Sequence, residues 1–439
     1  MSRTRWLRLL AIVTVPALFL TACPADEPEE EDPEPVETPD DTETEEPEDD
    51  VTRGDGVLSL GFVLPETGDL AFLGDPMIEG LNYAVEQINE AGGVLGEDVT
   101  LTGGDEAGDT AVASETADRL LADGVDAIIG AAATGMSLAI IDQVTGAGVV
   151  QCSGSNTGPV FTTYEDDGFY FRTAPTDALQ GPILAEKIVG DGHTQVALAA
   201  RSDEYGEGLL DATSAALEEQ GATVVEEVLY DPTADTFDSE VQQLVDANAD
   251  AIALISFEEG AQLVSGMIEA GIGPGEVALY GADGVATADF PASVDPGDPN
   301  VVDGMSGTRP DASVDPEFQS GLEEFAPDLE DFTFAPQIYD CAVITALAAV
   351  AANSDDPEVF VEEMNNVTRD GEECTNFADC VALLEDGEDI DYQGPSGATT
   401  FTDAGEPAIG TYEIWEFADG EFTVIESGIE STLEEGAEE

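Results

Sequence analysis

The sequence is poorest in positive charge. Its 439 residues include 10 Lys and Arg against 97 Asp and Glu, with one lysine, Lys187, and one histidine, His193, for a formal net charge of -87. A surface this acidic repels nucleic acid, so we exclude nucleic acid as a partner. The single histidine also excludes most histidine-based catalytic triads and metal facial triads.

Enzyme signatures are missing as well. The chain has no G-x-S-x-G elbow, no Walker loop and no G-x-G-x-x-G at the start of an expected helix. Carboxylates are so abundant that a catalytic acidic pair cannot be argued from them. The acidic loop 386–391 is an alternative calcium site, but it lacks the EF-hand spacing. We therefore predict neither an enzyme nor a cofactor or metal.

The acidity has three possible explanations. Disorder of the whole chain conflicts with a hydrophobic content of 42% and with periodic apolar segments. A specific acidic docking surface would concentrate the charge, whereas here the charge is spread along the chain. We prefer an acidic surface adapted to salty surroundings, where screening by salt relieves the self-repulsion.

Long apolar runs are also scarce, and one of them lies at the N-terminus. Arg3, Arg5 and Arg8 precede the run 9–20, which is too short to span a bilayer. The following Leu-Thr-Ala-Cys23 resembles the bacterial lipobox, so we predict a lipoprotein signal peptide, 1–22, and lipidation of Cys23. The alternative is an ordinary signal peptide with a chance cysteine. Export places the protein on the outer face of the cell membrane.

Two terminal segments are expected to stay outside the folded body. Residues 23–55 are almost only Glu, Asp, Pro and Thr, and self-repulsion and proline keep such a linker extended. Residues 429–439 form an acidic tail. The linker would separate a lipid anchor from the globular body.

Cysteine is rare too, with five in the chain. Setting Cys23 aside leaves four, an even number that suits an oxidising compartment. Cys374 and Cys380 bracket a short loop and are predicted to pair, and Cys152 and Cys341 would then pair by default. Zinc is the alternative, although the one histidine is distant in sequence and no C-x-x-C is present.

What the chain does contain is strand and helix in regular alternation. Alternation at these lengths implies right-handed crossovers and parallel sheets covered on both faces. Because the alternation restarts after residue 175, we predict two α/β domains. The expected strands are 57–63, 99–101, 127–129, 149–150, 196–200, 224–230, 251–255, 277–280, 396–401, 411–417 and 422–425. The expected helices are 75–91, 110–123, 134–145, 176–189, 206–220, 237–248, 260–270, 316–325, 336–352 and 357–367.

Polar loops follow several of the expected parallel strands, at the edge where open α/β sheets bind ligands. The loop 131–135 opens a helix, and helix amides together with the Thr134 hydroxyl can hold a carboxylate without arginine. Ser155 and Thr157 follow the next strand, and Asp283 offers a carboxylate to a cation in the second domain. This combination predicts a zwitterion site. Turn formation and helix capping are the alternative role of each loop.

Several motifs resemble those of one family, in order and spacing. The chain resembles the solute-binding lipoproteins of branched-chain amino-acid ABC transporters, the type I periplasmic binding proteins. The resemblance implies two Rossmann-like lobes with parallel central sheets, joined by a three-segment hinge. Lobe one would comprise 56–174 and 308–411, and lobe two 175–307 and 412–428. The matching motifs are GLNYAVEQINEAGG (80–93), IG (129–130), SNT (155–157), FRTAP (171–175), DEYGEG (203–208) and QIYD (337–340).

The resemblance also implies roles for eight residues. Thr134, Ser155 and Thr157 would hold the ligand α-carboxylate, and Asp283 would bind its α-ammonium. Tyr205 would close over the main-chain groups. Three residues would line the side-chain pocket: Leu73, Phe257 and Phe334. Better-known members carry glutamate in place of Asp283 and tyrosines in place of Leu73 and Phe257, so this pocket is more apolar. Core packing is the alternative role of the aromatic residues.

The resemblance implies a binding protein of an ABC importer, which captures a branched-chain or other aliphatic amino acid between its lobes and delivers it to the membrane permease. We expect a monomer. Short amides, urea or small organic and aromatic acids are alternative ligands, and a sensory receptor of the same fold is an alternative role. If Cys152 pairs with Cys341, both ends lie in lobe one, so the bridge would brace the ligand loop without locking the hinge.

Overall fold

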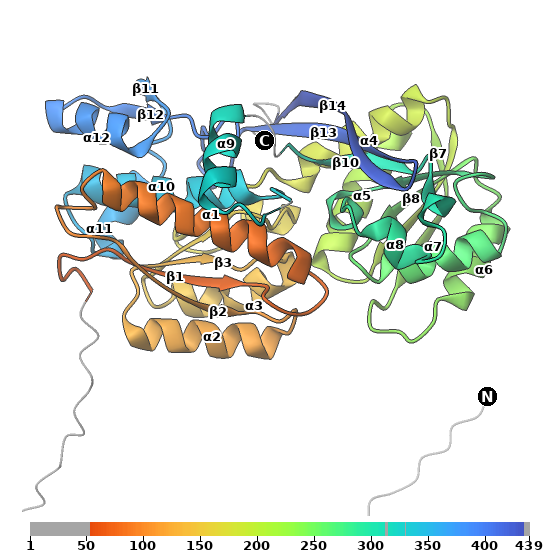
Figure 1. The fold of residues 1–439 in the computed structure, drawn as a ribbon, viewed down its shortest axis with the longest axis horizontal. Helices are drawn as coiled ribbons and strands as arrows, with labels where there is room; N and C mark the ends of the chain where they lie inside the picture. Colours follow the sequence, from red (N-terminus) through yellow and green to blue (C-terminus); the bar gives the residue numbers. More distant parts are fainter. Residues whose placement is uncertain (1–52, 312–314, 330, 434–439) are drawn as a thin grey trace, which may run out of the picture. The chain divides into compact units, whose positions relative to one another are not determined.

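Two central β-sheets organise the part of the chain that the computed structural model describes, which is residues 53–311, 315–329 and 331–433. One sheet has five strands in the order β2-β1-β3-β4-β5, and the other has seven in the order β14-β13-β10-β9-β8-β6-β7. Figure 1 shows both sheets with their helices. The predicted signal peptide, Cys23, nearly all of the linker and the end of the acidic tail lie outside the described residues.

The five-stranded sheet is parallel throughout. Its strands are β1 (Ser59–Leu64), β2 (Thr100–Asp105), β3 (Ala127–Gly130), β4 (Val150–Ser153) and β5 (Tyr170–Arg172). Neighbouring β3 residues point to opposite faces: Ile129 packs with α1 (Ala71–Glu90) and α10 (Ala335–Ala352), and Ile128 packs with α2 (Thr110–Asp123) and α3 (Thr134–Thr145). Burial on both faces explains why this strand is a continuous apolar run.

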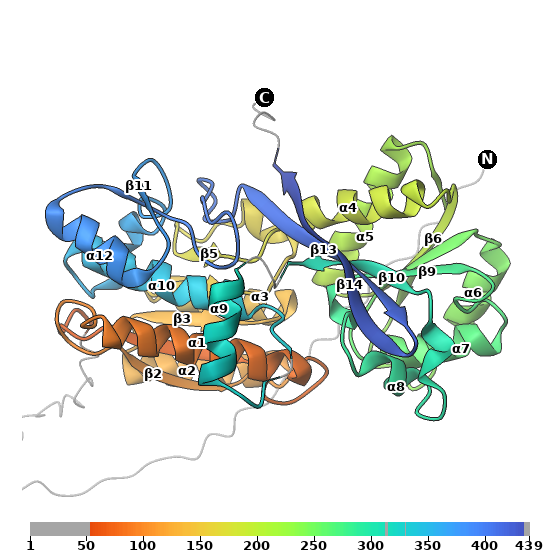
Figure 2. The same ribbon diagram turned by 45° about the horizontal axis from the view of Figure 1, so that its top comes forward.

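The helices of this sheet begin and end at local sequence features. Asp109 caps α2 by accepting bonds from the amides of Ala111 and Val112, and Gly124 ends the helix in the left-handed region. Helices α1 and α10 lie side by side (Figures 1 and 2). Among the described residues, α10 is the helix long and apolar enough to cross a membrane, but it is buried in the core of this lobe.

The seven-stranded sheet is mixed. Its strands are β6 (Gln195–Arg201), β7 (Thr223–Tyr230), β8 (Ala251–Ile255), β9 (Ala278–Gly281), β10 (Ser306–Pro310), β13 (Ile409–Ala418) and β14 (Glu421–Thr432). The pairs β10–β13 and β13–β14 are antiparallel and the other pairs are parallel, so the predicted parallel central sheet carries an antiparallel edge. The β13–β14 hairpin is visible in Figure 2. The helices of this sheet are α4 (Asp177–Gly190), α5 (Glu204–Glu219), α6 (Asp238–Ala247), α7 (Gly260–Glu269) and α8 (Phe290–Val294).

The chain passes between the two sheets three times, after β5, after β10 and before β13. We call the five-stranded sheet with its helices lobe one and the seven-stranded sheet with its helices lobe two. Strand β10 lies wholly in lobe two because it pairs with β9 and β13. The expected boundary at 307/308 therefore falls inside a strand, and β13 begins at Ile409, slightly before the expected boundary at 411/412.

Several elements differ from the sequence expectation. Helix α1 begins at Ala71 and continues through Pro76, and Gly74 allows this early turn because a Cβ there would meet the Pro65 carbonyl oxygen at 2.1 Å. The expected strand 396–401 is wrong, since only an isolated bridge joins Phe401 to Pro407. The expected helix 357–367 is a short α11 (Pro357–Phe360) followed by a 3-10 turn (Val361–Glu363). Helix α9 (Pro316–Phe325) was expected. The elements that were not expected are β5, α8, β10, β11 (Glu372–Cys374), α12 (Phe377–Asp386) and β12 (Ile390–Tyr392).

Both expected disulfides are present. Cys152 in β4 is joined to Cys341 in α10, and Cys374 is joined to Cys380. The first bridge ties the strand that leads into the 153–158 loop to a buried helix of the same lobe. It therefore leaves the connections between the lobes free to bend.

Candidate functional site

All eight residues predicted to contact a ligand line one cavity between the lobes. Lobe one contributes Leu73, Thr134, Ser155, Thr157 and Phe334, and lobe two contributes Tyr205, Phe257 and Asp283. The other lining residues are Leu70, Ala132, Ala133, Asn156 and Gly284. The polar loops that follow separate parallel strands therefore meet, as their position at the carboxyl edges of the sheets requires.

The cavity is narrow. Its volume is about 20 Å³, which is enough for a single water molecule. An amino acid can enter only if the lobes separate or the lining side chains move. A wider groove of about 530 Å³ adjoins the cavity at Gly284 and runs along the boundary between the lobes.

The lobe-one side of the cavity is a helix N-terminus. The first bond of α3 runs from the Ser137 amide to the Ala133 carbonyl, so the amides of residues 134–136 have no partner within the helix. The Thr134 hydroxyl accepts a bond from the Gly158 amide at 3.2 Å, which leaves its own proton to donate. These donors and the helix dipole suit a carboxylate.

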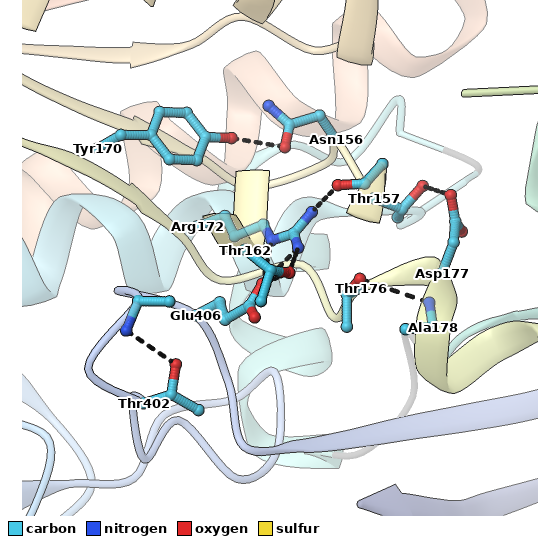
Figure 3. Close-up of polar contacts among 12 residues, drawn as sticks. Asn156, Thr157, Thr162, Tyr170, Arg172, Thr176, Asp177, Ala178, Thr402 and Glu406 are labelled. Carbon is cyan, nitrogen blue, oxygen red and sulfur yellow. Dashed lines mark hydrogen bonds and ion pairs between the residues drawn. The ribbon is translucent and has the colours of Figure 1, made fainter. Parts of the chain in front are cut away.

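The neighbouring hydroxyls of Ser155 and Thr157 differ from that of Thr134, because both donate their protons to acceptors within the protein. Ser155 Oγ donates to the Ala132 carbonyl at 3.1 Å, and Thr157 Oγ1 donates to Asp177 Oδ2 at 2.9 Å (Figure 3). Each hydroxyl has one proton, so both present lone pairs to any further partner. In this arrangement they can accept from an ammonium, whereas a carboxylate would find no proton on them.

On the lobe-two side, Asp283 supplies a buried carboxylate. It follows β9 and is 7% exposed, and its Oδ1 accepts from Gln180 Nε2 at 2.9 Å and from the Tyr205 hydroxyl at 3.1 Å. Burial raises the pKa of Asp283, partly offset by these hydrogen bonds. The site therefore favours a ligand that brings its own positive charge.

A second carboxylate lies close by. Asp177, in the first turn of α4, is fully buried, and burial followed by repulsion from Asp283 raises its pKa well above the usual range. Its Oδ1 has no hydrogen-bond partner among the described residues. Two buried carboxylates of like charge are stabilised when a cation comes near them.

Arg172 fixes the ligand loop to the connections between the lobes. Its Nη1 donates to the Gly158 carbonyl at 2.8 Å, and its Nε donates to Glu406 Oε2 at 2.9 Å (Figure 3). Arg172 and Glu406 are both buried and form an ion pair. Arg172 ends β5 and Glu406 precedes β13, so this pair joins the first and third crossings.

The remaining wall is apolar. The rings of Tyr205 and Phe257 stack with centroids 5.1 Å apart and an angle of 18°. Leu73 and Phe334 face them from lobe one, and Phe334 is held at a φ of 60° just before α10. This wall suits an aliphatic side chain.

Several residues around the cavity were not identified as site residues from the sequence. Glu106 follows β2 and accepts a bond from the Ala132 amide at 2.7 Å, and burial raises its pKa to about 8. Its position directly after a strand was an available signal. Asp177 lies at the start of the expected helix 176–189, where acidic residues are common and give no sign of a binding site. Arg201, behind the aromatic wall, had no sequence signal.

Metal binding finds no support in the described part of the chain, where no group of three or more His, Cys, Asp or Glu side chains is placed to hold an ion.

Comparison with known proteins agrees with this architecture. The family described as periplasmic binding protein matches residues 57–414. Leu/Ile/Val-binding protein homolog 3 of Brucella melitensis is 25% identical over 372 residues, covering 84% of this chain and 94% of the relative. A chemotactic signal transduction system substrate-binding protein of Halobacterium salinarum is 28% identical over 380 residues, covering 82% and 87%.

Among solved structures, a leucine binding protein from Thermotoga maritima superimposes with a TM-score of 0.71 at 20% identity, covering 84% of this chain and 98% of that one. At this identity the likeness concerns the fold, which is the predicted pair of α/β lobes. The family match covers nearly all of the described residues. The chain therefore belongs to the periplasmic binding protein family, with the type I architecture of the Leu/Ile/Val-binding proteins.

Proposed function

We propose that the protein is the extracytoplasmic solute-binding component of an ABC importer and captures a branched-chain or other aliphatic amino acid between its lobes. The observation that carries this proposal is the polarity of the cavity, with a free helix N-terminus in lobe one and the buried carboxylate of Asp283 in lobe two. A zwitterion matches both ends, and the apolar wall between them matches an aliphatic side chain.

Each end of the ligand has its own partners. The first amides of α3 and the Thr134 hydroxyl receive the α-carboxylate. Asp283 receives the α-ammonium, and the Thr157 and Ser155 hydroxyls accept its remaining protons because their own protons are already donated. These bonds support a role for Thr157 and Ser155 at the ammonium, in place of the expected role at the carboxylate. Tyr205 closes over the main-chain groups, and the side chain lies against Leu73, Phe257 and Phe334.

Capture depends on closure. The ligand contacts both lobes only when they are together, so it binds the closed arrangement more tightly and shifts the population toward it. A permease that recognises the closed form then receives the ligand. The predicted lipid at Cys23 would hold the protein as a monomer at the outer face of the membrane, with the linker 23–55 as its tether.

A second candidate is the capture of the same ligand for sensing. The Halobacterium salinarum relative is named as part of a chemotactic system, and the same binding event would serve a transducer in place of a permease. Short amides and urea are the competing ligands. Small organic and aromatic acids are disfavoured because an anion that lacks an amine brings no cation to the buried carboxyl groups of Asp283 and Asp177.

A ligand screen tests the proposal. Thermal-shift measurements at high salt would compare aliphatic amino acids, amides, urea and small organic acids, and ligand binding raises the unfolding temperature. We expect stabilisation by L-leucine, L-isoleucine or L-valine. Calorimetry on Asp283→Ala should then show no binding while the fold is retained. Unchanged affinity in that variant, or stabilisation by an amine-free acid alone, would contradict the zwitterion assignment.

A further inference from the structure

Arg201 lies behind the aromatic wall of the cavity. It is the last residue of β6, it is 8% exposed, and its guanidinium carbon lies 3.7 Å from the centre of the Phe257 ring. A guanidinium in this position is attracted to the ring face, and more strongly where water is excluded. The same ring stacks on Tyr205.

The guanidinium also connects the two loops that carry these aromatic residues. Its Nε donates to Asp203 Oδ2 at 2.5 Å, and its Nη1 donates to Glu259 Oε1 at 3.1 Å. Asp203 precedes Tyr205 by two residues, and Glu259 follows Phe257 by two residues. One cation thus holds the β6–α5 loop and the β8–α7 loop at a fixed separation.

Both acceptors are themselves held in place. Asp203 Oδ1 accepts from the Gly206 amide at 2.9 Å and caps α5. Glu259 Oε1 also accepts from the Tyr230 hydroxyl at 3.0 Å. The guanidinium therefore bridges two anchored groups, which gives it a defined orientation behind Phe257.

Resting on the proposed function, we infer that Arg201 is a positioning residue that fixes Tyr205 and Phe257 against the ligand and so sets the preference for the ligand side chain. Tyr205 donates to Asp283, so its position also determines where the ammonium partner lies. The ligand main chain is held by lobe one and Asp283, whereas Phe257 faces the side chain. Loss of Arg201 should thus weaken the binding of ligands with large side chains more than the binding of ligands with small ones.

Because basic residues are scarce in this chain, the use of an arginine at this position is informative. After removal of the predicted signal peptide with Arg3, Arg5 and Arg8, seven of the 10 basic residues remain. A planar fork can reach two carboxylates and stack on a ring at once, which an ammonium cannot do. A buried pair is also screened by salt far less than an exposed one.

Calorimetry on Arg201→Lys and Arg201→Gln, with L-leucine and L-alanine as probes, tests the inference. We expect Arg201→Gln to weaken L-leucine binding about tenfold and L-alanine binding only about twofold, with a smaller effect in Arg201→Lys. Arg119→Gln is the matched control, since Arg119 is half-exposed, pairs with Asp123 at 3.7 Å and lies on α2 of lobe one. This control should leave both affinities within about twofold.

The outcomes separate the inference from the proposed function. Unchanged affinity in both Arg201 variants, or an equal loss for leucine and alanine, overturns the positioning role. If the wild-type protein binds no amino acid in the screen, the proposed function fails. Hydrogen exchange then decides the positioning role alone: faster exchange at 203–206 and 256–259 in Arg201→Lys supports it, and unchanged exchange overturns it. Because the lysine variant keeps the charge, it serves where Arg201→Gln does not fold.

Discussion

The two sides of the cavity are suited to opposite charges of the proposed ligand, and they differ in the groups that they present. Lobe one presents backbone amides and the Thr134 hydroxyl, all uncharged. Lobe two presents the carboxylate of Asp283 and an aromatic pair supported by Arg201. In a chain with 10 basic residues, an anion site made of helix amides needs no cation. One of the few arginines can then support the wall that contacts the side chain.

The largest expected loss of affinity comes from removing the negative charge of Asp283 on the lobe-two side. Asp283→Asn keeps the size of the side chain and its bond from Tyr205 but removes the negative charge. We expect L-leucine affinity to fall about a hundredfold or more, since a buried charge-assisted bond is lost. Calorimetry measures this loss. Asp289→Asn, which alters the adjoining groove without touching the cavity, is the control and should bind like the wild type.

A smaller effect is expected on the uncharged side. Thr134→Val removes the hydroxyl and keeps the shape of the side chain and the amides of α3. Because several donors share the carboxylate, we expect about a tenfold loss of affinity for L-leucine. A loss as large as that of Asp283→Asn would show that the amides of α3 contribute little. That result would contradict the helix N-terminus as the carboxylate site.

The two sides should also respond differently to pH. The raised pKa values of Asp177 and Asp283 mean that the unliganded pair holds protons at a pH where ordinary carboxylates have lost them. Protonation removes the partner of the ammonium, so affinity should fall as pH decreases through the raised pKa. Arg172 near Asp177 and Arg309 near Asp283 favour the charged forms and limit the shift.

Calorimetry in buffers of different ionisation enthalpy checks this behaviour, since ligand binding should release protons to the buffer. Asp283→Asn should abolish most of the release. Thr134→Val should leave the pH dependence unchanged, because the substitution removes no titrating group. Proton release that is identical in all three proteins would contradict this division of roles.

The smallest expected effect on ligand affinity concerns the support behind the helix N-terminus, which should appear in the pH dependence of stability. The pKa of Glu106 is raised to about 8, mainly by burial, so the folded state binds its proton more tightly than the unfolded state does. Its contribution to stability is full below pH 4.5 and is lost as pH rises to about 8. We expect the wild type to lose on the order of 4 kcal/mol relative to Glu106→Gln across this range, because one pKa unit corresponds to about 1.4 kcal/mol. Urea unfolding at pH 5 and pH 8 measures the difference, and parallel pH profiles would contradict it.

The sequence was most informative where one local rule decided the structure. Short apolar runs that alternate with helical segments predicted the parallel strands β1 to β4 and β6 to β9, because buried parallel strands are continuous apolar runs. The position of Thr134, Ser155 and Asp283 directly after such strands predicted that they meet. The two disulfides followed from counting the cysteines.

It was least informative where distant partners decide the outcome. The direction of the Thr157 proton depends on Asp177, which is near only after the first crossing folds. Arg201 acts through Phe257 and Glu259 on another loop, so no local pattern marks it. Strand β10 contains the polar residues Thr308 and Arg309, whose burial depends on pairing with β13. From the local sequence alone, such residues are predicted to lie in a loop.

The central claim is that the cavity binds both charges of a zwitterion, one on each lobe. Calorimetry of the wild-type protein with L-leucine, isovalerate and isoamylamine tests this most directly, because the two analogues each lack one charged group. We predict binding of L-leucine and no measurable binding of either analogue. Binding of isovalerate as tight as that of L-leucine would contradict the account, since Asp283 would then face no ammonium.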